Sequence, residues 1–150
     1  MTVIIRFLNI ILAGLIAGAL FVIWIGYDPK NLSAQAYVEQ QQNVIKALNT
    51  LMPILGLIAI ILTVSSAFIQ KSSKFIFGTL LLAAVMLIIG GLVTRFGNQP
   101  INSLVMTWKL DNIPSNWLEL RDKWCSLNLI RTAATFLAFC LIVFANVRKR

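Results

Sequence analysis

The sequence lacks histidine altogether and contains only two cysteines among its 150 residues. Without histidine, the commonest general base and a usual ligand of zinc and haem are both missing. Cys125 and Cys140 fall on one expected helix, which places them about 22 Å apart. That distance is too long for a disulfide bond. We therefore expect no metal site and no bound cofactor.

Charged residues are also scarce, at 12% of the chain, whereas hydrophobic residues make up 59%. Soluble globular proteins carry about 25% charged residues. The net charge is +8, but the basic residues form no cluster interleaved with aromatic side chains, which nucleic-acid binding would require. We therefore expect a membrane protein whose main partner is the lipid bilayer, and no nucleic-acid partner.

Four long apolar runs cover most of the chain. They comprise residues 7–27, 52–69, 75–93 and 125–147, the last interrupted by Asn128, Arg131 and scattered threonines. Each is close to the ~20 residues that cross a bilayer as a helix. The first run is interpreted as a retained span, because no charged cluster precedes it and no small-x-small cleavage site comes before Asp28. The sequence thus predicts an all-α integral membrane four-helix bundle, with residues 1–150 forming a single four-span domain.

The few charges are segregated between the two sides of the predicted membrane. The side that holds both chain ends carries Arg6, Lys71, Lys74, Arg148, Lys149 and Arg150. The opposite side carries all five acids, Asp28, Glu39, Asp111, Glu119 and Asp122. Basic loops stay on the cytoplasmic side of membrane proteins. We therefore expect a multi-pass protein of the inner (plasma) membrane with both termini in the cytoplasm.

Helices 2 and 4 are expected to extend beyond the outer side of the membrane. Residues 33–50 are rich in glutamine with interspersed apolar residues, which predicts an amphipathic helix that continues into the second span with a kink at Pro53. The glutamines are interpreted as a solvated face, with the lining of a site mouth as the alternative. The fourth helix should begin at Trp117 and project about two turns before Cys125. Both projections should pack with residues 98–116 as a cap, in which a short helix lies along the surface.

The fourth helix carries a polar stripe at helical spacing. Its members are Trp117, Arg121, Trp124, Asn128, Arg131 and Thr135. Steps of three and four residues place them on one helix face, and polar faces of membrane helices turn inward. Arg131 keeps its charge when buried, so it needs a carboxylate, carbonyl groups, water or an anionic ligand. The alternative is that its side chain snorkels to the outer headgroups.

A pocket open to the outer side is the hypothesis that follows from this stripe. Two asparagines after the third span would direct their side-chain amides toward the mouth of this pocket. Alternatively, they would cap a helix. Tryptophan rings would line the pocket. Alternatively, they would anchor the protein at the membrane interface. The candidate substrate-binding residues are Arg131, Asn128, Trp124, Arg121, Asn98, Asn102 and Trp117. The expected ligand is a lipophilic, anionic small molecule.

Two motifs carry a resemblance to a known family. They are Asn98-x-Pro100-x-Asn102 after the third span and Arg121-x-x-Trp124-x-x-x-Asn128-x-x-Arg131 in the fourth helix. With the four-span layout, they resemble the anthrone-oxygenase-like family of small membrane proteins. The resemblance implies a cofactor-free oxygenase that converts anthrones into anthraquinones. Some relatives carry histidine near the fourth span, whereas this chain offers no imidazole base.

Three functions remain open at the level of sequence. In a cofactor-free oxygenase, Arg131 and Arg121 would stabilise an enolate, and Asp122 or Glu119 would be the side-chain base. A non-catalytic binder of a lipid or quinone-like molecule would use the same pocket. A structural subunit would use the polar stripe only to hold a bundle or a homo-oligomer together.

Overall fold

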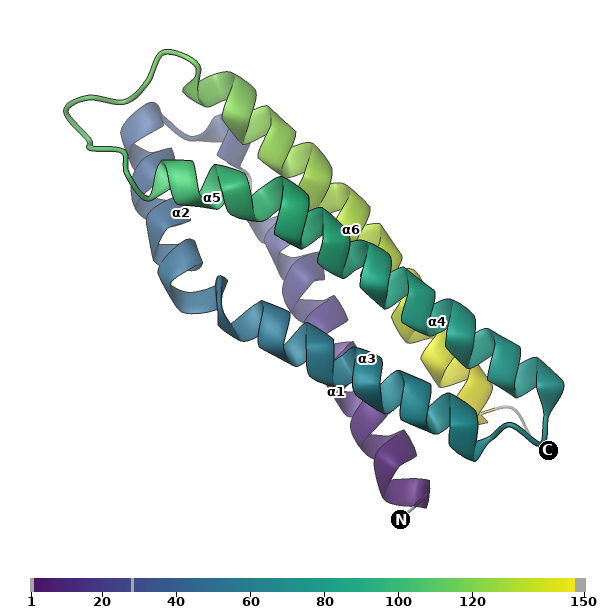
Figure 1. Cartoon of the computed structure of the whole chain (residues 1–150). Coiled ribbons are helices and arrows are strands. Elements are labelled where there is room, and N and C mark those ends of the chain that lie inside the picture. The colour runs from purple at the N-terminus through teal and green to yellow at the C-terminus, as the bar shows by residue number, and fades with distance from the viewer. Residues whose placement is uncertain (1, 28, 148–150) are drawn as a thin grey trace.

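Four long helices form the body of the protein, as predicted. The computed structural model describes residues 2–27 and 29–147 (Figure 1). The long helices are α1 (Thr2–Gly26), α3 (Leu51–Ile69), α4 (Lys74–Val93) and α6 (Trp117–Val147). All four belong to segments long and apolar enough to cross a membrane. A multi-pass membrane helical bundle is thus confirmed.

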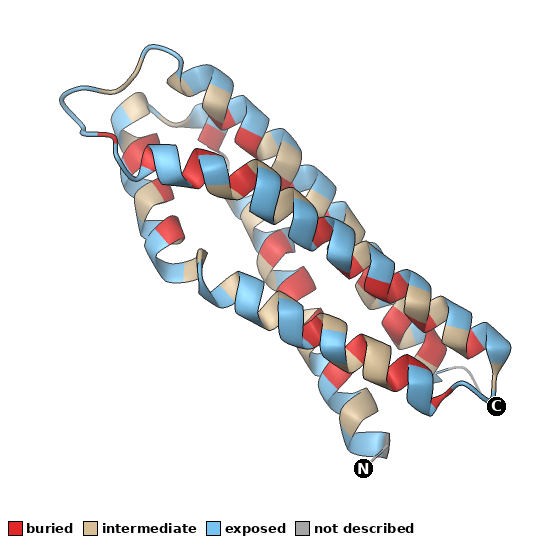
Figure 2. Ribbon diagram, in the orientation of Figure 1, coloured by how far each residue is buried: buried red, intermediate tan, exposed pale blue. Residues whose placement is uncertain are grey.

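The long helices pack in the ring α1–α3–α4–α6, each mainly against two neighbours. Buried positions recur along each helix with exposed positions between them (Figure 2). The core between them is built from small and branched side chains, including Ala13, Ala59, Ala83, Ala138 and Ile142. Small residues allow helix backbones to approach closely where no water drives their association. Large apolar side chains cover the outside of the ring, as contact with lipid requires.

The ring has two distinct ends. At one end of the ring, α1 begins and α6 ends (Figure 1). There Arg6 Nε donates to Asn146 Oδ1 at 2.7 Å. We call this the proximal end. The opposite, distal end carries the short helices α2 (Ala34–Leu48), α5 (Gln99–Val105) and the single 3-10 turn η1 (Pro29–Asn31).

The second predicted helix is two helices. α2 ends at Leu48 and α3 begins at Leu51, so the break lies at Asn49 and Thr50, before Pro53. Pro53 occupies the first turn of α3, where a backbone N–H has no helical acceptor to lose. Pro53 therefore lies at the start of α3 and does not kink a continuous helix, contrary to the expectation. The break allows α2 to turn away from the axis of α3 at the distal end (Figure 1).

The expected surface helix after the third span instead continues that span. α4 passes through the π-helical turn η2 (Thr94–Asn98) into α5, which ends at Val105 and stops short of Lys109. Pro100 explains the wider turn, because its ring clashes with the carbonyl four residues earlier in a regular α-helix. The π turn relieves that clash and keeps the chain helical.

Packing of α2 against α5 and the first turns of α6 produces the predicted cap. Its core consists of Tyr37, Val38, Ile45, Ile101, Val105, Trp108 and Trp124. Gln42 Nε2 adds bonds to the carbonyls of Val105 and Trp108, at 2.9 and 3.0 Å. These bonds fix the start of the loop that leads to α6. That the cap stands above the outer membrane surface stays a prediction.

The orientation of the protein is open to a direct test. Ser72 lies exposed in the turn between α3 and α4, and Ser103 lies exposed on α5, at the distal end. In a variant with both native cysteines replaced by alanine, we expect a membrane-impermeant maleimide to label Ser103→Cys in intact cells. Ser72→Cys should react only after lysis, because the basic residues Lys71 and Lys74 favour a cytoplasmic position of that turn. Labelling of Ser72→Cys from the outside would reverse the orientation.

Candidate functional site

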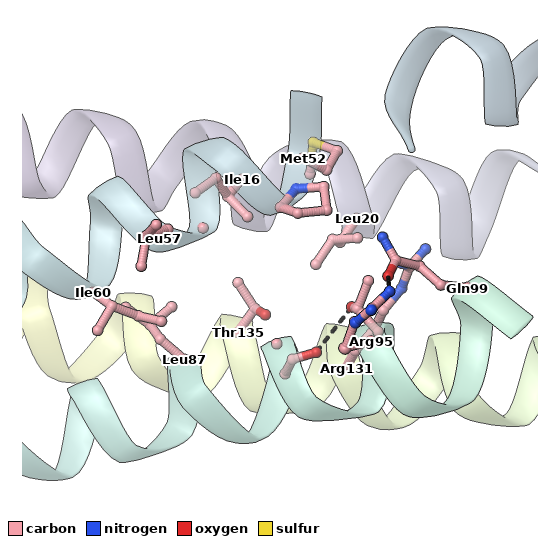
Figure 3. Close-up of a pocket in the computed structure, with 15 residues that line it drawn as sticks. Ile16, Leu20, Met52, Leu57, Ile60, Leu87, Arg95, Gln99, Arg131 and Thr135 are labelled. Atoms are coloured by element: carbon pink, nitrogen blue, oxygen red, sulfur yellow. Dashed lines mark hydrogen bonds between the residues drawn. The ribbon is translucent and has the colours of Figure 1, made fainter. Parts of the chain in front are cut away.

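A cavity of about 220 Å³ lies among the four long helices, toward the distal end (Figure 3). Most of its wall is apolar. The apolar side chains are Ile16 and Leu20 from α1, Met52, Pro53, Leu57 and Ile60 from α3, and Leu87 from α4. Polar side chains gather at its distal part, where Thr94, Arg95, Gln99 and Arg131 line it. The cavity therefore combines an apolar body with a cationic end.

Arg131 lines this cavity from α6, as the polar stripe predicted. Its Nε donates to Asn128 Oδ1 at 2.9 Å, and its Cζ lies 5.7 Å from the ring centroid of Trp124. These two contacts come from the preceding turns of the same helix and orient the guanidinium. No described carboxylate forms an ion pair with Arg131. The guanidinium thus contacts an amide oxygen and a ring face. Its other N–H groups can bind an anion in the cavity.

A second arginine borders the same cavity, and it is Arg95. Its Nη1 donates to Gln99 Oε1 at 3.1 Å, one turn further along the chain. Arg95 lies in the π turn η2, and Gln99 is the first residue of α5. The π turn therefore sets the direction of the Arg95 and Gln99 side chains relative to α4. Figure 3 shows Arg95, Gln99 and Arg131 grouped at one end, with Ile60 and Leu87 at the other. Two cations at one end of a low-dielectric cavity repel each other, and an anion between them would offset that repulsion.

A buried hydrogen-bond network joins the helices next to the cavity, and Asn102 is its centre. Asn102 Oδ1 accepts from Trp124 Nε1 at 2.9 Å and from Gln41 Nε2 at 3.5 Å. Asn102 Nδ2 donates to Asn49 Oδ1 at 2.9 Å. Tyr27 completes the chain by donating its hydroxyl to Gln41 Oε1 at 3.0 Å. The network thereby fixes the Trp124 ring on which Arg131 rests.

Asn98 and Asn102 therefore act between helices. Asn98 Nδ2 donates to the carbonyl of Trp124 at 3.2 Å and makes no capping bond to its own helix. It ties the π turn to α6. Asn102 and Trp124 also line a small side cavity of about 40 Å³ that Arg131 borders. The tryptophan and both asparagines thus form the support behind Arg131.

Arg121 and Trp117 do not line the cavity. Arg121 donates from Nε and Nη2 to Asp122 Oδ1, at 3.0 and 2.9 Å, and from Nη1 to the carbonyl of Lys30 at 3.3 Å. Its Cζ lies 5.2 Å from the ring centroid of Trp117. Arg121 and Arg131 share a helix face, but ten residues of helix separate them by about 15 Å. Arg121 therefore fastens α6 to η1.

The acids considered as a catalytic base lie elsewhere as well. Asp122 pairs with Arg121, and neither it nor Glu119 lines the cavity. Trp24 borders a different cleft between α1 and α6, together with Tyr27 and Asn128. The residues of α1 that line the Arg131 cavity are Ile16 and Leu20.

Sequence reasoning missed Asn49 and Gln99 as neighbours of the candidate site. Gln41 is fully buried, contrary to the solvated face expected for the glutamines. A signal was present, because Tyr37, Gln41 and Ile45 recur every four residues and share one face of α2. Burial also raises the pKa of the Tyr37 hydroxyl, so this tyrosine stays neutral in the cap.

Comparison with known proteins adds one match. Residues 42–141 match the family model described as anthrone oxygenase. The match covers two thirds of the chain and includes all seven candidate residues as well as Arg95. No curated protein and no solved structure matches the chain.

Proposed function

Because the chain belongs to the anthrone oxygenase family, we propose that it binds an enolisable aromatic molecule in the Arg131 cavity and oxidises it with dioxygen, without a bound cofactor. The observation that carries this proposal is the guanidinium of Arg131 at the end of an apolar cavity, with no described carboxylate paired to it. Such a site favours a flat, lipophilic ligand with an oxygen that bears negative charge.

Arg131 would act on the acidity of the ligand. An anthrone loses a proton from its methylene carbon to give an enolate whose charge rests on oxygen. A cation within about 4–6 Å lowers the pKa of such a group by about 1–3 units. The low-dielectric wall strengthens the attraction. Since no described carboxylate lines the cavity, the proton would pass to water.

The oxidation balances with dioxygen alone. The enolate transfers an electron to dioxygen, and the two radicals combine to form a carbon–oxygen bond. The resulting peroxide takes up a proton and becomes a hydroperoxide, which then loses water to leave a carbonyl. A methylene group and one dioxygen thus yield one carbonyl group and one water. In this scheme the protein supplies binding, orientation and charge stabilisation of the enolate, which are strong effects in a preorganised site.

Turnover of anthrone tests this proposal. The purified protein in lipid nanodiscs should form anthraquinone roughly a hundred-fold faster than protein-free nanodiscs, the size of effect that one oxyanion-stabilising group supplies. Oxygen uptake and quinone absorbance should rise in a ratio of one to one. A wild-type protein that binds anthrone yet leaves its oxidation at the protein-free rate would contradict the oxygenase proposal.

Among the residues that the structure describes, no carboxylate or thiol lines the cavity, which favours a second candidate, a non-catalytic binder of the same anionic, lipophilic class. A binder needs Arg131 but no base. It would retain anthrone in nanodiscs, saturably, while oxygen uptake stays at the protein-free rate. Oxygen uptake in the turnover experiment therefore separates the two functions.

A further inference from the structure

The exposed residues that line the cavity lie on one side of the bundle. Its four exposed lining residues are Pro53 and Leu57 on α3 and Gly91 and Arg95 on α4 and η2. The lining residues contributed by α1 and α6 are buried or partly buried. The cavity is therefore closed behind by α1 and α6 and reached between α3 and α4.

Two glycines keep this opening wide. A Cβ atom added at Gly56 or at Gly91 would meet no atom within 4 Å. The neighbouring Gly90 differs, because a Cβ there would lie 3.1 Å from Thr135 Oγ1. Gly90 thus allows α4 to approach α6, whereas Gly91 is turned toward empty space. Figure 1 shows α3 and α4 close together at their connecting turn and further apart toward the distal end.

Apart from Arg95 at its distal edge, the surroundings of the opening are apolar. Exposed side chains on the adjoining turns are Ile54 and Ile58 on α3 and Ile88 and Leu92 on α4. All four belong to segments long and apolar enough to span a membrane. An opening flanked by such side chains within a membrane-spanning segment faces acyl chains and not water.

We propose that the ligand of the Arg131 cavity enters sideways from the hydrocarbon of the distal leaflet, through the opening between α3 and α4. The inference rests on the proposed function for the existence of a ligand and adds its route and its class. The ligand is an amphiphile that carries an anionic or enolisable oxygen to Arg131. Its apolar body fills the opening beside Leu57 and Gly91.

The size of the cavity supports this class. At about 220 Å³ it is smaller than the roughly 300–1,000 Å³ of typical ligand sites. A molecule of several fused rings therefore leaves part of its apolar surface in the opening, where lipid covers it. A free lipophilic molecule and a membrane phospholipid both combine a negative oxygen with an apolar body. We assign the site to the free molecule.

Gly91→Leu tests the route, because leucine fills the opening and suits a helix better than glycine. Anthrone is added to nanodiscs, and its entry is followed by stopped-flow quenching of tryptophan fluorescence, which needs no turnover. We expect the rate of entry to fall at least ten-fold. Gly78→Leu is the matched control, since Gly78 is also exposed on α4 with open space around it and lies outside the cavity. It should leave the rate unchanged.

Two further measurements complete the test. If the ligand enters from lipid, the wild-type rate of entry follows the mole fraction of anthrone in the bilayer, and not its concentration in water. Equal rates for Gly91→Leu and wild type, or a rate that follows the aqueous concentration, would overturn the route. Mass spectrometry of lipids retained by the purified protein addresses the ligand. A stoichiometric phospholipid that is retained by wild type and lost in Arg131→Leu would overturn the assignment to a free molecule.

Failure of the oxygenase proposal and failure of the lateral route give different experimental results. If wild type admits anthrone quickly and does not oxidise it, the oxygenase proposal fails and the lateral route stands. If wild type oxidises anthrone and Gly91→Leu admits anthrone as fast as wild type, the route fails and the oxygenase stands.

Discussion

Arg131→Leu is expected to lower kcat/KM for anthrone oxidation by about 10²–10³-fold, the usual effect of removing one group that stabilises an oxyanion. Leucine preserves apolar volume in the cavity and removes the charge that favours the enolate. The fold should persist, because the variant also removes a costly buried cation that has no described ion-pair partner. Oxygen uptake by nanodiscs measures the effect, and a thermal unfolding curve checks the fold.

Two companions make the result specific to Arg131. Arg131→Lys keeps a charge but loses the planar contact with Trp124 and the bond from Nε to Asn128, so it should retain part of the activity. Lys123→Leu removes a positive charge from an exposed position of the same helix and should leave activity unchanged. Wild-type activity in Arg131→Leu, or an equal loss in Lys123→Leu, would show that the cavity charge does not act on the substrate.

Asn102→Leu is expected to destabilise the protein by about 3–5 kcal/mol, because each buried polar group left without a partner costs about 1–3 kcal/mol. The variant strands the Trp124 N–H, the Gln41 amide and the Asn49 side-chain oxygen together. Leucine has the same branched arrangement and the same number of side-chain heavy atoms as asparagine, so the loss is mainly one of hydrogen bonds. The free energy of unfolding in mixed micelles measures it.

Asn102→Asp and Ser103→Ala are the controls for this loss. Aspartate keeps an acceptor for Trp124 and Gln41 but cannot donate to Asn49, so we expect an intermediate destabilisation. Ser103 is the exposed neighbour on α5 and bonds only to the Gln99 carbonyl of its own helix, so Ser103→Ala should change stability by less than about 0.5 kcal/mol. An Asn102→Leu variant as stable as wild type would mean that the network does not hold the cap.

Sequence alone determined the four spans, because crossing a bilayer demands a run of apolar residues whatever the neighbours are. It also determined the group formed by Trp124, Asn128 and Arg131. These three residues lie within two turns of one helix, and helical spacing brings their side chains together without help from tertiary contacts. The structure confirms that group through the bond from Arg131 to Asn128 and the contact with Trp124.

Only the tertiary structure decided what meets this group from other helices. Arg121 shares the stripe but lies about 15 Å further along the axis, where η1 gives it other partners. Gln99 lines the cavity just beyond the π turn, and Gln41 reaches Asn102 because α2 breaks away from α3 at Asn49. Such encounters depend on the relative height and rotation of packed helices. These are set by contacts between residues distant in sequence, so the periodicity of a single helix does not reveal them.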